Sequence, residues 1–314
     1  MRLILPLIIG LALILVLGCT SSLPIEPSNE DKEDNGDSFI LRIQVQIQDD
    51  SSAGASTVWV PVPGNDGVQE VELLASPVGS KLSLPDEYGN RFASLTDWKG
   101  QLLEWKYRIN RRVDAGGLLQ GVPVSHYLSA NRLVPIGGEA AARAKEVVAS
   151  KQDVSVARAI YNRVLEDMCY DKRGFGWGTG STEWACDTGY GNCTDFHALF
   201  ISMARSLKIP ARFTIGFPVP TDGSGEIDEY HCWAHFWDGQ GGWVPVDISE
   251  ADQHPERTEF FFGTLDPNRV SLSYGRDLIL DPPQEGDPLN YFVNAYAEQD
   301  GLPLGVKTSV YYQH

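Results

Sequence analysis

The sequence predicts an α+β protein, and three features of the residue pattern indicate this class. Residues 39–48 alternate apolar and polar side chains, which is typical of a half-buried strand. Residues 139–150, 153–168 and 193–207 each repeat apolar side chains at the spacing of one helical face. Residues 230–247 are rich in aromatic residues on both sides of a glycine-rich turn, which predicts a hairpin. The order of these segments, with strands first, then helices and then strands again, predicts a small β-sandwich followed by a core of helices and antiparallel sheet.

The N-terminus has the pattern of a signal peptide, assigned to residues 1–18. Arg2 precedes an apolar run that is too short and wrongly flanked for an ordinary membrane span. Leu17, Gly18 and Cys19 resemble a bacterial lipobox, in which the cysteine is lipidated after cleavage and becomes the mature N-terminus. A plain signal peptide or a short membrane anchor stays open as the alternative. Each of these readings predicts an exported protein that works outside the cytoplasm, and the lipobox predicts a lipid anchor to the cell membrane or outer membrane.

Residues 19–38 are polar and acidic and show no periodicity, which predicts a flexible linker. The whole chain of 314 residues has 42 Asp and Glu against 25 Lys and Arg, a formal net charge of −17. A chain this acidic repels a nucleic-acid backbone, so we expect no nucleic-acid partner.

The folded part is expected to divide into two domains. Residues 39–135 are assigned to the β-sandwich and residues 136–314 to the catalytic domain. Three short strand-like runs follow the first strand, at 58–62, 68–74 and 103–109. In the second domain, residues 172–188 are rich in glycine and predict a loop over the site, while the tail from residue 260 to 312 shows strand-like pieces with little chemistry.

Cys193 is the candidate nucleophile. It comes at the start of the helical pattern of residues 193–207, directly after Asn192, a good N-cap residue, and Asp195 suits the reciprocal half of a capping box. Unpaired N–H groups and the helix dipole at this position favour a thiolate over a thiol. A lone helical cysteine is more often a small buried residue, so the assignment needs a base.

The predicted hairpin supplies that base and its partner. His231 lies in its first strand and Asp247 at the end of its second, so antiparallel pairing brings them side by side. A cysteine, a histidine and a carboxylate that fixes the histidine's tautomer form a nucleophilic triad.

At these residues the sequence resembles the transglutaminase-like superfamily of papain-related thiol enzymes, in particular its prokaryotic envelope members. The family's Gly-x-Cys-x-Asp run is matched by residues 191–195, and its Gly-Ile-Pro-Ala-Arg run by residues 208–212, with Lys208 in place of the glycine. His-x-Trp is matched at 231–233, and Gly-Trp-Val-Pro-Val followed by aspartate at 242–247. The resemblance spans residues 139–314. It implies a papain-like fold, the triad Cys193, His231 and Asp247, and a protein or peptide substrate in the cell envelope, with no cofactor and no metal.

The resemblance leaves the acyl acceptor open. Water would make the protein a cysteine peptidase or amidase, and an amine would make it a transglutaminase. Prokaryotic relatives include hydrolases and no EF-hand-like calcium loop is evident, so hydrolysis is the leading expectation. A non-catalytic envelope binding or scaffold module is the alternative from another class.

Other residues have competing interpretations. His197 follows Cys193 by one helical turn and is read as a hydrogen-bonded core histidine. His231 and His235 have a spacing that binds zinc on a helix, but on a strand these positions are about 13 Å apart and cannot share a metal. The oxyanion hole is expected to include the backbone N–H of Cys193, with Trp184 or Trp177 as candidates for the second donor. A disulfide between Cys169 and Cys186 stays open.

Overall fold

The alternating pattern at the start of the chain forms β1 (Asp37–Ile47), whose inward residues Phe39, Leu41, Ile43 and Val45 are buried. The structure, a computed structural model, describes residues 36–48, 56–117, 123–150 and 155–314. The predicted signal peptide, the lipidation site Cys19 and almost all of the predicted linker lie outside the described residues. No helix in the described ranges is both long enough and apolar enough to cross a membrane.

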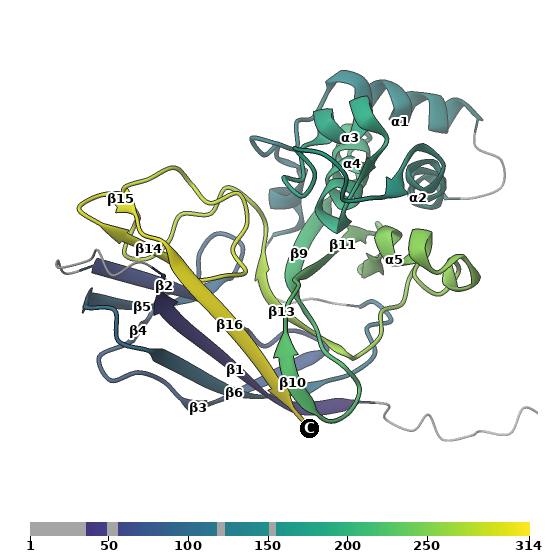
Figure 1. The fold of residues 1–314 in the computed structure, drawn as a ribbon. Helices are drawn as coiled ribbons and strands as arrows, with labels where there is room; N and C mark the ends of the chain where they lie inside the picture. The colour runs from purple at the N-terminus through teal and green to yellow at the C-terminus, as the bar shows by residue number, and fades with distance from the viewer. Residues whose placement is uncertain (1–35, 49–55, 118–122, 151–154) are drawn as a thin grey trace, which may run out of the picture. The chain divides into compact units, whose positions relative to one another are not determined.

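The N-terminal strands lie in two five-stranded antiparallel sheets (Figure 1). The first has the order β10-β16-β1-β6-β3 and the second the order β15-β14-β2-β5-β4. Apolar side chains from both sheets share one core with the rest of the protein. The strands from the first part of the chain are β2 (Ser56–Val62), β3 (Gln69–Ala75), β4 (Lys81–Leu82), β5 (Arg91–Trp98) and β6 (Leu103–Arg111).

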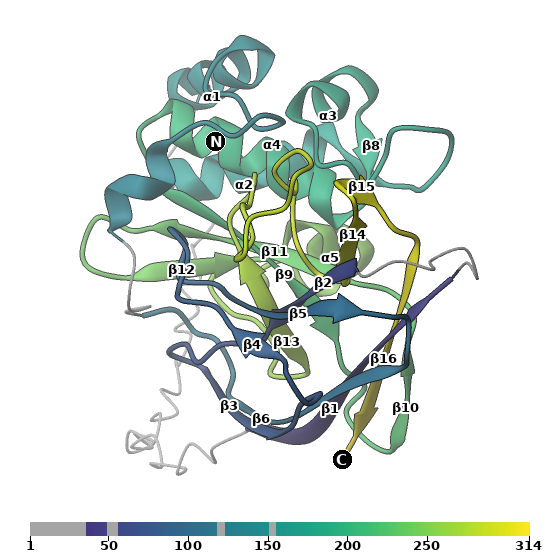
Figure 2. The same ribbon diagram turned by 90° about the vertical axis from the view of Figure 1, so that its left-hand side faces the viewer.

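The C-terminal tail completes these sheets. Strand β16 (Val306–Gln313) pairs with β1 along its length, and β14 (Tyr296–Gln299) pairs with β2. Figure 2 shows β16 running beside β1 and β10 (Ser224–Ile227). The two-residue strand β15 (Leu302–Pro303) pairs with β14. The predicted boundary near residue 135 stays a prediction, but the last strands of the chain belong to the same sheets as the first.

The predicted helices surround α4 (Cys193–Ser206). Helices α1 (Gly138–Ser150), α2 (Val156–Asp167) and α3 (Thr182–Thr188) all pack against it. The sequence predicted one buried face on α4, but every residue from 193 to 205 is buried. The polar residues among them have partners: the guanidinium of Arg205, for example, donates to the carbonyl of Ala211 at 2.8 Å. Helix α4 is therefore a central helix of the core, which fixes the residue at its N-terminus.

A four-stranded antiparallel sheet packs against α4 in the order β12-β11-β9-β13. The hairpin of β11 (His231–Trp237) and β12 (Trp243–Val246) agrees with the prediction, and β9 (Ala211–Pro218) pairs with β11 on its other side. Strand β13 (Arg269–Tyr274) lies beyond β9. The fold is thus α+β, as predicted. The remaining short elements are η1 (Val124–Leu128), β7 (Cys169–Tyr170), β8 (Tyr190–Gly191), α5 (Ile248–Gln253) and η2 (Pro255–Arg257).

The prediction that residues 172–188 form a loop is wrong for its second half. Residues 182–188 form α3, which begins after Ser181, whose side chain accepts a hydrogen bond from the N–H of Trp184. It ends at Gly189, which adopts a left-handed conformation with φ of 66°. A serine N-cap and a glycine C-cap were visible in the sequence, but the preceding glycines obscured a helix of only two turns.

Candidate active site

Cys193 is the first residue of α4, and the predicted capping box is confirmed. The side chain of Asn192 accepts a hydrogen bond from the N–H of Thr194 at 3.0 Å, and Asp195 accepts one from the N–H of Asn192 at 3.0 Å. Gly191 is required here because a Cβ atom on it would lie 2.4 Å from Oδ2 of Asp195. The backbone N–H of Cys193 lies in the first helical turn, where an N–H group has no helical partner.

Asp195 also fixes the loop before the nucleophile. Its carboxylate accepts hydrogen bonds from the N–H groups of Gly178 at 2.7 Å and Gly180 at 2.9 Å. The carbonyl groups of the same loop are held from the other side: Arg276 donates to the carbonyl of Gly180 at 2.8 Å, and Tyr291 donates to that of Gly178 at 3.0 Å. The loop is therefore held in place through its backbone.

The hairpin brings His231 and Asp247 into contact. Strand β11 starts at His231, and Asp247 follows β12 as the N-cap of α5. Nε2 of His231 lies 2.7 Å from Oδ2 of Asp247, so it donates its proton to this oxygen and leaves Nδ1 for another partner. Both side chains are buried, Asp247 completely.

Asp247 accepts three further hydrogen bonds. Nη1 of Arg269 donates to Oδ2 at 2.9 Å, and Oδ1 accepts from the hydroxyl of Ser249 at 3.1 Å and the N–H of Glu250 at 3.2 Å. Burial on its own would raise the pKa of Asp247, but the charge and hydrogen bond of His231 and the charge of Arg269 hold it below its usual value. The carboxylate is therefore ionised and fixed in position.

The side chains of His231 and Cys232 lie close enough to the Cys193 thiol to affect its pKa. Burial opposes a charge on the thiol, but these hydrogen bonds and the charge of His231 lower its pKa to about 6. Burial likewise opposes a charge on His231, but Asp247 and then Cys193 raise the pKa of His231 to about 10. Both shifts favour a thiolate on Cys193 beside an imidazolium on His231.

His197 is occupied on both ring nitrogens. Its Nδ1 lies 2.7 Å from the carbonyl oxygen of Cys193 and donates to it, and its Nε2 accepts the N–H of Ile248 at 3.2 Å. Burial lowers the pKa of His197 to about 4, so the ring is neutral. It links the backbone of Cys193 to the residue after Asp247, which agrees with its interpretation as a hydrogen-bonded core histidine.

The tail contributes more than the sequence predicted. Arg269 on β13 reaches Asp247, and Arg276 just after β13 reaches the loop at Gly180. The expectation that residues 260–312 carry little chemistry is therefore wrong. Both arginines are almost completely buried, and buried arginines need acceptors, but nothing in the sequence identifies which acceptors they find.

The remaining candidate residues are placed as follows. Trp184 packs against Gly176 and Tyr190, and its indole nitrogen has no hydrogen-bond partner among the described residues. No hydrogen bond described in the structure joins Trp184 or Trp177 to Cys193, so both oxyanion assignments stay predictions. Cys169 and Cys186 are free thiols and are not bridged.

His235, four residues after His231, contacts a different carboxylate. Its Nε2 lies 2.9 Å from Oδ2 of Asp114, which follows β6 in the sequence. Its Nδ1 accepts a hydrogen bond from Nη2 of Arg212 at 3.4 Å. The two histidines of the HxxxH spacing thus serve separate clusters.

The helices and sheet that carry these residues have known relatives. Residues 141–248 match the core-domain model of the transglutaminase-like superfamily. The matched segment runs from α1 to the residue after Asp247, and it includes Cys193 and His231. It is a transglutaminase-like core. This confirms the resemblance predicted from the sequence motifs.

Two solved structures and one further sequence are similar to most of the chain. The crystal structure of a "putative cysteine protease" from Cytophaga hutchinsonii superposes with a TM-score of 0.54 at 16% identity, covering 89% of this chain and 98% of that one. The periplasmic domain of TgpA from Pseudomonas aeruginosa covers 70% of this chain and 92% of its own at 17% identity, with a TM-score of 0.39. An uncharacterized protein of Haemophilus influenzae is 25% identical over 306 residues, or 81% of this chain and 83% of the relative. The similarity to the Cytophaga hutchinsonii structure shows that the two proteins share a fold.

Proposed function

We propose that this protein is a cysteine peptidase or amidase in which Cys193, His231 and Asp247 act as the catalytic triad. The observation that carries the proposal is the contact of His231 with Asp247 at 2.7 Å, with Cys193 near enough for the thiol and the imidazole to shift each other's pKa. The pKa of the thiol is lowered and that of the imidazole is raised, so each group has the protonation state that its role requires.

The reaction begins when the Cys193 thiolate attacks the carbonyl carbon of an amide. The tetrahedral intermediate collapses as the C–N bond breaks, and the His231 imidazolium gives its proton to the departing amine. This leaves a thioester on Cys193 and a neutral imidazole on His231. Asp247 keeps the imidazole oriented through Nε2 throughout. Water then attacks the thioester, His231 takes its proton, and the acid and the thiolate are released.

Transamidation is the second candidate, and the burial of the nucleophile favours it. Cys193 is only 2% exposed, and the loop in front of it is pinned by Asp195, Arg276 and Tyr291. A thioester that is shielded from water survives until an amine displaces the thiolate. In that case the same three residues form an isopeptide bond instead of releasing an acid.

We further propose that the chain is exported and held to a membrane by lipid on Cys19, so that its protein or peptide substrate lies in the cell envelope. The support is the sequence Leu17, Gly18, Cys19 after an apolar run, which precedes the described residues. The intact mass of natively expressed protein tests this proposal. A mature N-terminus other than a lipidated Cys19 contradicts it.

The experiment for the catalytic proposal compares wild type with Cys193→Ala. Each is incubated with a protein substrate and a primary amine, and three products are measured: new amino termini, ammonia and incorporated amine. We expect wild type to form new termini or ammonia and Cys193→Ala to form none, because no thioester can form. Amine incorporation in excess of hydrolysis supports transamidation instead. Turnover by pure, folded Cys193→Ala would remove the covalent mechanism.

A further inference from the structure

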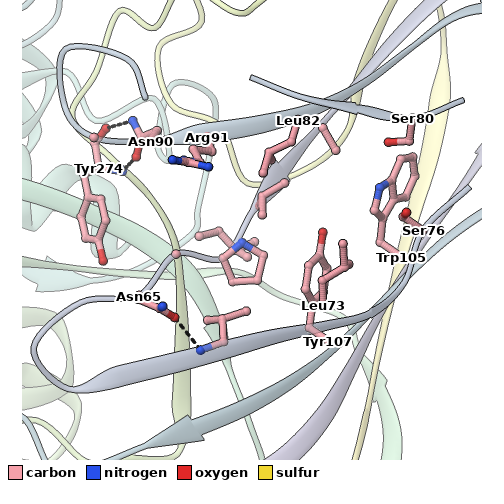
Figure 3. Close-up of a pocket in the computed structure, with 17 residues that line it drawn as sticks. Asn65, Leu73, Ser76, Ser80, Leu82, Asn90, Arg91, Trp105, Tyr107 and Tyr274 are labelled. Atoms are coloured by element: carbon pink, nitrogen blue, oxygen red, sulfur yellow. Dashed lines mark hydrogen bonds between the residues drawn. The ribbon is translucent and has the colours of Figure 1, made fainter. Parts of the chain in front are cut away.

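Cys232 is a thiol that the proposed reaction does not use. It follows His231 on β11, is completely buried and is not bridged to another cysteine. The pocket of about 540 Å³ between the two N-terminal sheets, in contrast, is lined by no cysteine, histidine or carboxylate (Figure 3). That pocket therefore offers neither a thiol nor a histidine or carboxylate base, whereas a second thiol lies at the candidate active site.

A single nitrogen of His197 contacts both cysteines. Nδ1 of His197 donates to the carbonyl oxygen of Cys193 at 2.7 Å and lies 3.7 Å from Sγ of Cys232. Cys193 is 2% exposed, and His197 and Cys232 are completely buried. The Cys232 thiol is therefore held against the first turn of α4, the turn that begins with the proposed nucleophile.

The direction of β11 along α4 places Cys232 at the same end as Cys193. Cys232 and Phe236 lie four positions apart on this strand and so face the same side of the sheet. Phe236 packs on Phe200 of α4, with ring centroids 6.3 Å apart. This contact and that of Cys232 with His197 follow each other in the same direction along helix and strand. The N-terminus of α4, which carries Cys193, therefore lies at the Cys232 end of β11.

The two thiols also act on each other's ionisation. Burial raises the pKa of Cys193, but the side chain of Cys232 and then His231 lower it to about 6. Burial raises the pKa of Cys232 well above its usual value, and Cys193 raises it further. One sulfur therefore carries the negative charge while its neighbour keeps a proton. A reactive thiolate beside a protonated thiol is the arrangement of an attacking and a resolving cysteine.

We propose that Cys193 and Cys232 form a peroxide-sensitive pair, in which oxidation of Cys193 closes a disulfide with Cys232 and stops the enzyme reversibly. The proposal rests on the proposed function in one respect, because it takes Cys193 to be the reactive thiolate that small molecules reach. The substrate of the second reaction is a hydroperoxide, and hydrogen peroxide is the simplest one.

The oxidation has two steps. The Cys193 thiolate attacks one oxygen of hydrogen peroxide, the O–O bond breaks and hydroxide leaves, so Cys193 becomes a sulfenic acid. The sulfur of Cys232 then attacks the sulfur of Cys193. The S–OH bond breaks, and its hydroxyl group leaves as water with the proton of the Cys232 thiol. The two sulfurs together give two electrons to the peroxide, and an added dithiol returns them.

Cys232 should protect the nucleophile as well as block it. A sulfenic acid without a thiol beside it reacts with more peroxide to form a sulfinic acid, which dithiols do not reduce. In wild type the disulfide forms first and ends the reaction. Replacement of Cys232 should therefore turn a reversible loss of the Cys193 thiol into an irreversible one.

The test treats wild type, Cys232→Ala and the matched control Cys186→Ala, which removes another buried free thiol, with hydrogen peroxide. Mass spectrometry of the digests and iodoacetamide labelling of Cys193 are measured before oxidation, after it, and after dithiothreitol. In wild type and Cys186→Ala we expect a disulfide-linked peptide pair of Cys193 and Cys232, with labelling lost and then regained. In Cys232→Ala we expect sulfinic acid on Cys193 and a permanent loss of labelling.

Oxidised wild type without the linked peptides overturns the proposal, and this readout needs no variant to fold. Recovery of labelling in Cys232→Ala to the level of wild type also overturns it. The amide turnover of untreated wild type is measured in parallel. A protein that forms the disulfide but never turns over an amide contradicts the proposed function and keeps the cysteine pair.

Discussion

His231 and His235 lie four residues apart on the same strand, and both hold a buried aspartate through Nε2, at 2.7 Å and 2.9 Å respectively. They differ in the second group that acts on the ring. For His231 this group is the Cys193 thiol, an acid that can give up its proton. For His235 it is the guanidinium of Arg212, a permanent cation that donates a hydrogen bond.

This difference separates the two pKa values. The pKa of His231 is raised to about 10, because Asp247 and the Cys193 thiolate favour the imidazolium. The pKa of His235 is lowered by burial and by the charge of Arg212, although Asp114 acts in the opposite direction. A histidine–aspartate pair thus provides an acid for catalysis or a neutral structural link, and the group at the second nitrogen decides between them.

The largest expected effect is the loss of the acid in His231→Ala. Acylation of Cys193 should slow by roughly 10³–10⁴-fold, since the leaving amine receives no proton and the thiolate loses its counterion. Single-turnover acylation with a thioester-forming substrate measures this. His197→Ala is the control on the helix and should be far milder, acting through packing. If His197→Ala were the inactive variant and His231→Ala nearly normal, the assignment of the base would be wrong.

A smaller effect is expected for Asp247→Asn, which keeps the shape and removes the charge. Acylation should fall by about 10²–10³-fold, because the imidazolium is less stable and its orientation is lost, while the Cys193 thiolate forms at higher pH. The rate and its pH dependence are measured together. An Asp247→Asn enzyme with a normal rate and an unshifted profile would show that the carboxylate does not orient the base.

The pair of His235 and Asp114 should affect the stability of the fold and not the rate of the reaction. His235→Ala leaves the buried carboxylate of Asp114 without its hydrogen bond, at a cost of about 3–5 kcal/mol in the free energy of unfolding. Urea unfolding measures the loss, and activity per folded molecule should change by less than about threefold. A stable His235→Ala protein that has lost its activity would show that the pair of His235 and Asp114 takes part in catalysis.

The smallest expected effect is a change in the pKa of His235 when Arg212, the cation beside it, is replaced. Arg212→Met should raise the pKa of His235, because the positive charge that disfavours the imidazolium is gone and Asp114 remains. NMR titration of the imidazole nitrogens reports both histidines in one experiment, and the pKa of His231 should stay unchanged. An unmoved His235 pKa would mean that burial alone keeps this ring neutral.

The sequence predicted the structural features that are local in the chain or that belong to a known motif. The N-cap Asn192 and the capping-box Asp195 lie within three residues of each other, and the hairpin that joins His231 to Asp247 spans sixteen positions. Lys208 stands where the family has a glycine, and its φ of 64° lies in the region where glycine is usual.

The sequence did not predict which residues far apart in the chain contact each other. Asp114 meets His235 across 121 positions, and Arg276 meets Gly180 across 96. Apolar patterning indicates which residues are buried, but it does not say which buried charge meets which. The placement of β16 beside β1 has the same cause, because strand pairing at this separation depends on the packing of the whole protein and leaves no local pattern.

In the proposed mechanism Cys193 is a thiolate at neutral pH because His231 and Asp247 stabilise it. A pH titration of thiolate ultraviolet absorbance, taken as the difference between wild type and Cys193→Ala, measures this directly. We expect a midpoint at about 6, with His231→Ala shifting it upward. A wild-type midpoint at about 8.5, the value of an ordinary thiol, would contradict the proposed thiolate.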